Sequence, residues 1–104
     1  MNKFESLLKY SKQLSVLYAE DHVELRNSTV EILSSFFTKV DIASDGGEAL
    51  DAYKDLFTQE NKHYDIVLTD IKMPNMNGVT LIEEIYKINP LQNIVVISAH
   101  DESA

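Results

Sequence analysis

The sequence of 104 residues contains no cysteine, which excludes disulfide bonds, thiolate zinc sites and thiol nucleophiles. It also lacks any apolar run long enough to span a membrane, so we expect no membrane partner. Residues 1–13 lack the apolar core and the small-residue cleavage site of a secretory signal. We therefore expect a cytoplasmic protein, since a chain without cysteine fits a reducing compartment.

Basic residues are scarce, with 9 Lys+Arg against 17 Asp+Glu and a formal net charge of −8. Such an acidic balance argues against nucleic acid or an anionic membrane as a direct partner. It suits a cation, or a partner protein with a basic patch. The 44% of apolar and 25% of charged residues are ordinary values for one globular domain of this length.

Short apolar runs alternate with helical patterns along the chain. Four runs, at 14–19, 40–44, 65–69 and 93–98, are rich in Val and Ile. The first, third and fourth are nearly continuous, as in strands buried on both faces, whereas the second alternates, which suits the edge of a sheet. Apolar residues at helical spacing predict helices over 23–37, 47–60 and 78–88. This order predicts an α/β fold with a parallel sheet. Residues 1–13 form an extension in which Phe4, Leu7 and Leu8 share one face of a possible short helix.

Acidic residues follow two of the predicted strands. Glu20 and Asp21 come after the first strand, Asp70 after the third, and Ser98 ends the fourth. Sites of parallel sheets form at the carboxyl ends of the strands, so we expect these side chains to converge there. Three carboxylates would supply oxygen ligands, which favour Mg²⁺ or Mn²⁺. A carboxylate can also attack phosphorus as a nucleophile. The alternative is that these residues are only helix caps and turn formers.

Four segments resemble one protein family in the same order and spacing. Residues 70–78 (DIKMPNMNG) resemble the DxxMPxMxG signature of the CheY-like receiver domains of two-component response regulators. Residues 18–21, 45–50 and 97–99 resemble the acidic pair, the loop into the second helix and the end of the fourth strand in that family. The resemblance implies a doubly wound, flavodoxin-like parallel sheet with strand order 2-1-3-4.

The resemblance also implies roles for the acidic residues. Asp70 would accept a phosphoryl group from a sensor histidine kinase or a phosphotransfer protein. Asp21 would ligate Mg²⁺ directly, Glu20 would act mainly through water, and the backbone carbonyl of Lys72 would be a further ligand. The chain would then be a self-phosphorylating acceptor and not a turnover enzyme.

Other positions are implied to shape the loop and to read the phosphoryl group. Met73 and Pro74 would shape the loop after Asp70, and Gly78 would fit a tight backbone turn. Ser98 and Ala99 would bind the phosphoryl group and move a surface that partners read.

Some polar residues near these motifs have smaller expected roles. Lys72 and His100 occupy positions that are thought to tune the lifetime of the phosphoryl group. His22 is expected to start a helix and not to ligate a metal. His63 is expected at the surface.

The family pattern continues beyond the fourth strand, whereas this sequence stops at Ala104. We therefore expect 14–104 to be an incomplete receiver domain without its last helix, strand and helix and without the lysine of that strand. An exposed fourth strand predicts a homodimer through that strand, or an exchange of elements. The alternative function is a fragment or pseudo-receiver that is not phosphorylated and acts only in protein association.

Two enzyme classes are weaker alternatives. Phosphatases of the haloacid dehalogenase type carry a second Asp two residues after the nucleophile, but this position is Lys72. Nucleotide-binding domains need G-x-G-x-x-G or GxxxxGK[ST], and neither occurs in the sequence.

Overall fold

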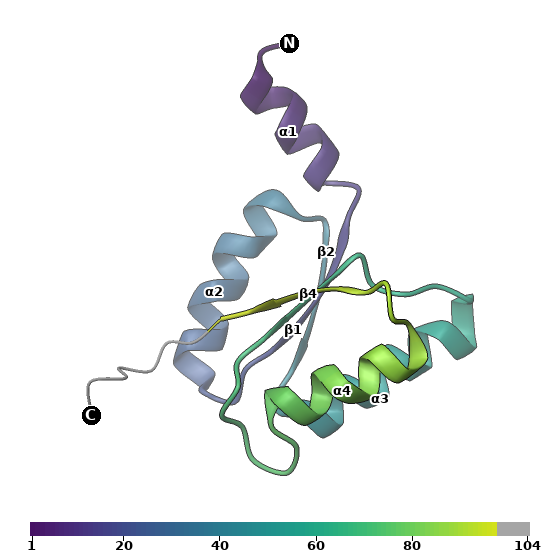
Figure 1. Ribbon diagram of the computed structural model, residues 1–104. Helices are drawn as coiled ribbons and strands as arrows, with labels where there is room; N and C mark the ends of the chain where they lie inside the picture. Colours follow the sequence, from purple (N-terminus) through teal and green to yellow (C-terminus); the bar gives the residue numbers. More distant parts are fainter. Residues whose placement is uncertain (98–104) are drawn as a thin grey trace.

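Helices and strands alternate along residues 1–97, the part of the chain that the computed structural model describes (Figure 1). Each predicted element is present, with ends that differ from the prediction by at most two residues. Within residues 1–97, no helix combines the length and the apolar character needed to cross a membrane. The elements are α1 (Lys3–Ser11), β1 (Ser15–Ala19), α2 (Val23–Phe36), β2 (Lys39–Ala43), α3 (Gly46–Glu60), β3 (Ile66–Thr69), α4 (Gly78–Ile88) and β4 (Asn93–Val96).

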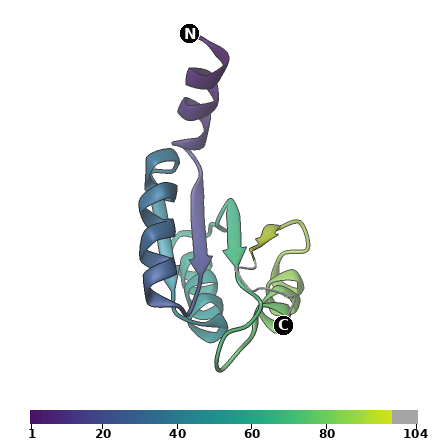
Figure 2. The same cartoon turned by 90° about the vertical axis from the view of Figure 1, so that its left-hand side faces the viewer.

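The four strands form one parallel sheet in the order β2-β1-β3-β4, which confirms the predicted fold class (Figure 2). Ala19 at the end of β1 pairs with Ala43 of β2 and with Thr69 of β3. The carboxyl ends of these three strands therefore lie in register. The residues that directly follow β1 and β3 in the sequence, Glu20 and Asp70, therefore lie close together at this edge of the sheet.

Helices pack on both faces of the sheet, as the near-continuous apolar sequence of β1 requires. Val16 and Tyr18 of β1 face α2 and pack with its Leu33. Leu17 faces the other side and belongs to the larger core cluster, to which α3 contributes Tyr53. Because successive strand residues point to opposite faces, the five residues of β1 serve both layers.

Polar side chains fix the starts of the helices near the site. Asp45 caps α3, and its carboxylate accepts a hydrogen bond of 2.8 Å from the N–H of Glu48. His22 caps α2, where its Nδ1 accepts a bond of 3.1 Å from the N–H of Leu25. This confirms the expectation that His22 starts a helix. Asn77 caps α4 in the same way.

The apolar run at 93–98 has the pattern of a doubly buried strand, but β4 lies at an edge of the sheet. Val95 is 49% and Val96 is 44% exposed. Within residues 1–97, β4 pairs with β3 on one side and with no strand on the other. Apolar side chains therefore remain in contact with solvent along this edge.

His63 departs from its expected place at the surface. Its ring stacks on Tyr53 and Phe57, with ring centroids 5.0 Å and 4.9 Å away. Tyr53 and Phe57 lie four residues apart on α3, so they share one face of that helix. His63 is therefore half-buried and not fully at the surface, because the short loop that follows α3 folds its ring back onto that helix.

α1 extends away from the sheet, beyond the amino ends of the strands (Figures 1 and 2). None of its residues is buried. The Asn2 side chain accepts a 2.8 Å bond from the N–H of Glu5, and the Glu5 carboxylate accepts one of 3.4 Å from the N–H of Asn2. This capping box stabilises the helix locally, without packing against the body.

Candidate functional site

Three carboxylates meet at the carboxyl end of the sheet. Glu20 and Asp21 directly follow β1, and Asp70 directly follows β3. One carboxylate oxygen from each of these side chains lies within 4.8 Å of the others. The structure thus brings together the three acidic residues that were expected to converge.

Strand pairing continues one residue past the strands and holds the acidic residues in place. The N–H of Glu20 donates a hydrogen bond of 3.0 Å to the carbonyl of Ala43, at the end of β2. The N–H of Asp70 donates one of 3.1 Å to the carbonyl of Ala19, at the end of β1. The backbone of the site is therefore an extension of the rigid sheet and not of a free loop.

Two of the three carboxylates are withdrawn from water. Glu20 is 4% and Asp70 is 3% exposed, whereas Asp21 is exposed. Burial raises the pKa of the Glu20 carboxyl, and the nearby Asp70 and Asp21 carboxylates raise it further. The N–H of His22, which donates to Glu20 Oε2 at 3.1 Å, acts in the opposite direction. A bound cation would relieve the repulsion among the carboxylates.

The cluster lines a cleft of about 830 Å³. The donors that it offers are carboxylate oxygens, which fit Mg²⁺ or Mn²⁺ and not a metal that prefers sulfur. Lys72, two residues after Asp70, also lines this cleft and is exposed. The cleft is lined by Glu20, Asp21, His22, Leu25, Asp70, Ile71, Lys72, Met73 and Asn77.

The loop after Asp70 returns to the site at Gly78. The N–H of Gly78 donates a hydrogen bond of 2.7 Å to the carbonyl of Ile71. A Cβ on Gly78 would lie 2.1 Å from the carbonyl oxygen of Asp70. Gly78 has no positive φ, so the need for glycine arises from this close approach and not from a special turn conformation. Met73 anchors the same loop by packing against the core cluster.

A second set of contacts fastens this loop to the start of α3. Asn75 has a positive φ of 66°, and its Nδ2 donates a 2.8 Å bond to Asp45 Oδ2. The N–H of Gly46 donates one of 3.0 Å to the carbonyl of Met76. The N–H of Met76 donates one of 2.7 Å to the carbonyl of Pro74, which tightens the tip of the loop. The cap of α3 and the loop beside the acidic cluster are therefore one connected unit.

Arg26 belongs to the site and was not predicted from the sequence. Its Nη1 donates a hydrogen bond of 3.0 Å to the carbonyl of Glu20. Its Nε is buried without a hydrogen-bond partner among the described residues. One feature of the sequence could have predicted this role. Arg26 lies four residues after the helix-capping His22, and from there a long side chain can reach back to the start of the helix.

The predicted switch residues Ser98 and Ala99, and the predicted lifetime-tuning residue His100, lie outside residues 1–97. The last described residue, Ile97, donates a hydrogen bond of 2.9 Å from its N–H to the carbonyl of Thr69. Thr69 precedes Asp70.

The sequence of the chain matches proteins of two-component signalling. The response regulator receiver domain family matches residues 16–104. The chemotaxis protein CheY of Thermotoga maritima is 38% identical over 90 residues, which are 86% of this chain and 70% of that protein. The sensor kinase CckA of Brucella abortus is 33% identical over 102 residues, which are 98% of this chain and 10% of the kinase. The chain thus spans most of one relative and a small part of the other.

Solved structures give the same result. CheY of Borrelia burgdorferi, in a complex with CheX, BeF₃⁻ and Mg²⁺, is 33% identical with a TM-score of 0.73, covering 86% of this chain and 66% of that one. The N-terminal domain of a Wolinella succinogenes protein is 31% identical with a TM-score of 0.70, covering 86% and 68%. With its acidic cluster at the end of a 2-1-3-4 sheet, the chain belongs to the response regulator receiver domains, which occur in two-component response regulators and in sensor kinases.

Proposed function

We propose that this receiver domain accepts a phosphoryl group on Asp70 from a phosphohistidine of a sensor histidine kinase or a phosphotransfer protein. The observation that carries the proposal is the Asp70 carboxylate, held by the sheet beside two further carboxylates in a cleft. An Asp70 oxygen would attack phosphorus and form an acyl phosphate, while the phosphorus–nitrogen bond breaks and its electron pair returns to the imidazole.

We propose that Asp21, Asp70 and the backbone carbonyl of Lys72 would hold Mg²⁺ (or Mn²⁺), with Glu20 acting mainly through water. When bound, the ion would neutralise the charge of the phosphoryl oxygens and of the carboxylates. Arg26 would fix the backbone of Glu20 through its hydrogen bond to the Glu20 carbonyl. Support comes from the oxygen-only donor set and from the Mg²⁺ in the Borrelia burgdorferi complex.

The proposed roles of the surrounding positions follow from the family pattern. Met73, Pro74 and Gly78 would shape the loop that presents the Lys72 carbonyl, and the contacts of this loop with Asp70 support that role. The Lys72 side chain, exposed along the cleft, would tune the lifetime of the acyl phosphate.

The switch residues complete this proposal. Ser98 would bind the phosphoryl oxygen together with Ala99, and His100 would tune the lifetime of the phosphoryl group. The chain would act as an acceptor and not as a turnover enzyme, with protein partners and not nucleic acid. A cytoplasmic location is part of the proposal, because a chain without cysteine fits a reducing compartment.

Self-association is a second candidate function, and the exposed apolar side chains favour it. Val95, Val96 and Ile97 are between 39% and 49% exposed at the edge of the sheet. An unpaired edge is a template for another chain, and exposed helices can be exchanged between copies. A domain that only associates would do so without phosphorylation.

The phosphoacceptor proposal is tested by intact-mass measurement after incubation with acetyl phosphate and Mg²⁺. We expect the wild-type chain to gain the mass of one phosphoryl group, and Asp70→Asn to gain none. Asp51→Asn, a matched change at an exposed position of α3, should still be phosphorylated. Chelating Mg²⁺ with EDTA should abolish the gain. Phosphorylation of Asp70→Asn, or none of the wild type, would contradict the proposal.

A further inference from the structure

A pocket of about 510 Å³ lies at the amino ends of β1, β2 and β3, at the opposite end of the sheet from the acidic cluster. It forms where three connections of the chain meet, from α1 to β1, from α2 to β2 and from α3 to β3. The charged and titratable residues that line this basic pocket are Lys12, Lys39, Glu60, Lys62, His63 and Asp65.

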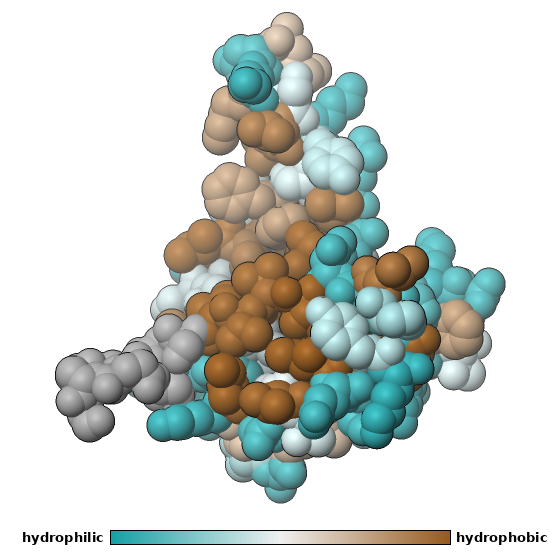
Figure 3. All heavy atoms as spheres, in the orientation of Figure 1, coloured by the Kyte–Doolittle hydropathy of each residue, from teal (hydrophilic) through white to brown (hydrophobic). Residues whose placement is uncertain are grey.

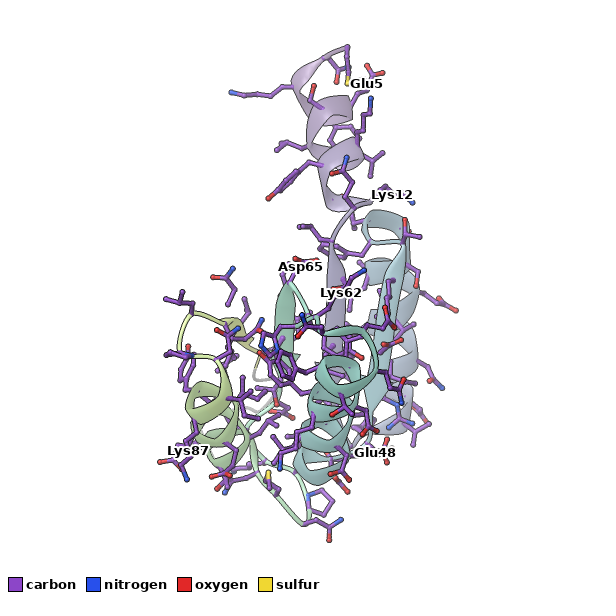
Figure 4. All side chains as sticks on the ribbon, turned by 90° about the vertical axis from the view of Figure 1, so that its right-hand side faces the viewer. Glu5, Lys12, Glu48, Lys62, Asp65 and Lys87 are labelled. Carbon is purple, nitrogen blue, oxygen red and sulfur yellow. The ribbon has the colours of Figure 1, made fainter. Side chains whose placement is uncertain are left out.

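Three ammonium groups line the basic pocket, one from each connection. Lys12 caps the end of α1, Lys39 is the first residue of β2, and Lys62 follows α3. Figure 4 shows Lys12 and Lys62 near the end of the body from which α1 extends. These are three of the eight lysines of a chain with a formal net charge of −8. A strongly acidic chain thus gathers positive charge in one place.

The three lysines of the basic pocket have no carboxylate partners within residues 1–97. In this part of the chain the ion pair joins Lys87 to Glu84, on α4. Lys39 lies instead beside an aromatic ring, with its Nζ 5.9 Å from the ring centroid of Tyr64. The three charges are therefore free to attract an anion from outside.

The acidic residues of the basic pocket do not neutralise it. Asp65 is engaged with β1, because its Oδ2 accepts hydrogen bonds of 2.8 Å from the N–H and of 3.1 Å from the Oγ of Ser15. Glu60, the last residue of α3, is exposed to water, which weakens its interaction with the lysines. Three ammonium groups face two carboxylates, so the lining has a positive balance.

The basic pocket is separate from the other surfaces to which a function has been given. Figure 3 shows hydrophobic residues gathered over β4, and no residue of β4 lines the pocket. The acidic cluster lies beyond the carboxyl ends of β1 and β3. A ligand in the basic pocket therefore touches neither Asp70 nor the edge strand.

We propose that the basic pocket binds a small organic phosphate that carries at least two negative charges. Lysine binds phosphate oxygens as a point charge, and three lysines from separate segments suit several oxygens in one compact group. The volume of about 510 Å³ falls within the roughly 300–1,000 Å³ of small-molecule sites. A large acidic protein fits less well, because the rest of this acidic chain would repel it. The proposal goes beyond the phosphoacceptor function and does not depend on it.

The test measures the binding of inorganic pyrophosphate to the full chain by isothermal titration calorimetry in EDTA. Without divalent metal, the carboxylates of the acidic cluster repel the anion, so binding there is suppressed. We expect one pyrophosphate per chain. Lys62→Gln should raise the dissociation constant by about fivefold or more, because it removes one of three charges. Lys62→Arg keeps the charge and should bind within about twofold of the wild type.

A control and a second readout locate the bound anion. Lys54→Gln makes the same change of net charge at an exposed residue of α3 that does not line the pocket. It should leave the dissociation constant within about twofold of the wild-type value. In an NMR titration, pyrophosphate should shift the amide signals of Lys39 and Lys62 and leave those of Glu20 and Asp70 unchanged.

Four results would overturn the proposal. One is no binding of pyrophosphate at low ionic strength, and another is an equal loss in Lys62→Gln and Lys54→Gln, which would reduce the attraction to net charge alone. The third is a set of shifts confined to the acidic cluster. The fourth is a poly-glutamate peptide that binds at Lys62 while pyrophosphate does not, which would make the pocket an interface for an acidic protein. Lys62→Gln should leave the phosphorylation of Asp70 unchanged, so each result is distinct from a failure of the phosphoacceptor function.

Discussion

Glu20 shows most clearly how the site combines buried negative charges. Its carboxylate is buried beside Asp70 and Asp21, an arrangement that costs folding free energy whenever all three are ionised. The structure opposes this cost with the N–H of His22, which donates to Glu20 Oε2. Repulsion among these carboxylates favours the binding of a cation, but it lowers the stability of the folded protein when no cation is bound.

The first prediction concerns the stability of the metal-free protein. Glu20→Gln should raise the free energy of unfolding at pH 7 in EDTA by about 0.5–2 kcal/mol, because it removes a buried charge. The folded state holds the Glu20 pKa above its unfolded value, so it binds the proton more tightly than the unfolded state does. The stability of the wild type should therefore fall as the pH rises from the ordinary glutamate pKa through the raised one. The advantage of Glu20→Gln should disappear at lower pH.

Urea unfolding from pH 4 to pH 8 measures this difference. Glu24→Gln is the matched control, since Glu24 is exposed in the first turn of α2. It should change stability by no more than about 0.5 kcal/mol at any of these pH values. Equal effects of the two substitutions, or a Glu20→Gln protein that is less stable than the wild type, would contradict the account. Saturating Mg²⁺ should reduce the advantage of Glu20→Gln by stabilising the wild type.

At the scale of elements, the loop between β3 and α4 joins the acidic cluster to two helices. Gly78 at the start of α4 lies against the backbone of Asp70, and Asn75 binds the cap of α3 through Asp45. The loop therefore holds its shape through both of its neighbours. Any change that separates Gly78 from Asp70 should disturb the acceptor position directly.

The prediction at this scale is that Gly78→Ala destabilises the protein by about 3 kcal/mol or more. The new Cβ would lie 2.1 Å from the Asp70 carbonyl oxygen, a backbone atom that cannot rotate away, so the cost exceeds that of ordinary overpacking. Thermal or urea unfolding measures the loss. Phosphorylation by acetyl phosphate should also fall, because the backbone of the acceptor must shift.

Gly47→Ala is the matched control, one helix away. The nearest atom to a Cβ at this position is Asp45 Oδ1 at 3.4 Å, an ordinary contact, and Gly47 has no positive φ. This substitution should be neutral or should stabilise the protein by about 0.4–1 kcal/mol. If the two alanine variants were equally stable, the close packing of Gly78 on Asp70 would not determine the shape of the loop.

The elements could be predicted from the sequence because their signals are local. The 3.6-residue stripes and Pro90 set the limits of α4, which ends at Ile88. The acidic cluster was also predictable, since parallel strands bring Glu20 and Asp70 to one edge. The tie between α3 and the loop after Asp70 was not predictable, because the Asp45–Asn75 bond joins residues that are 30 positions apart in sequence. His63 follows α3 directly, but its stack on that helix depends on how the short loop folds back. Arg26 was missed for a different reason: its partner is the backbone carbonyl of Glu20, and the residue types in the sequence do not show such a bond.

On the scale of the whole molecule, the two proposed functions depend on different strands of the sheet. The acidic cluster lies at the carboxyl ends of β1 and β3, whereas the exposed side chains of Val95 and Val96 lie on the edge strand β4. The body between them is small and strongly acidic, and β4 leaves one edge open within the described residues.

The most direct test of the central claim locates the phosphoryl group within the chain. After reaction with acetyl phosphate and Mg²⁺, borohydride reduces an aspartyl phosphate to homoserine, and peptide mass spectrometry identifies the reduced position. The account predicts homoserine at position 70 alone, and none in Asp70→Asn. Reduction at Asp21 or at another aspartate, with position 70 unchanged, would show that Asp70 is not the acceptor.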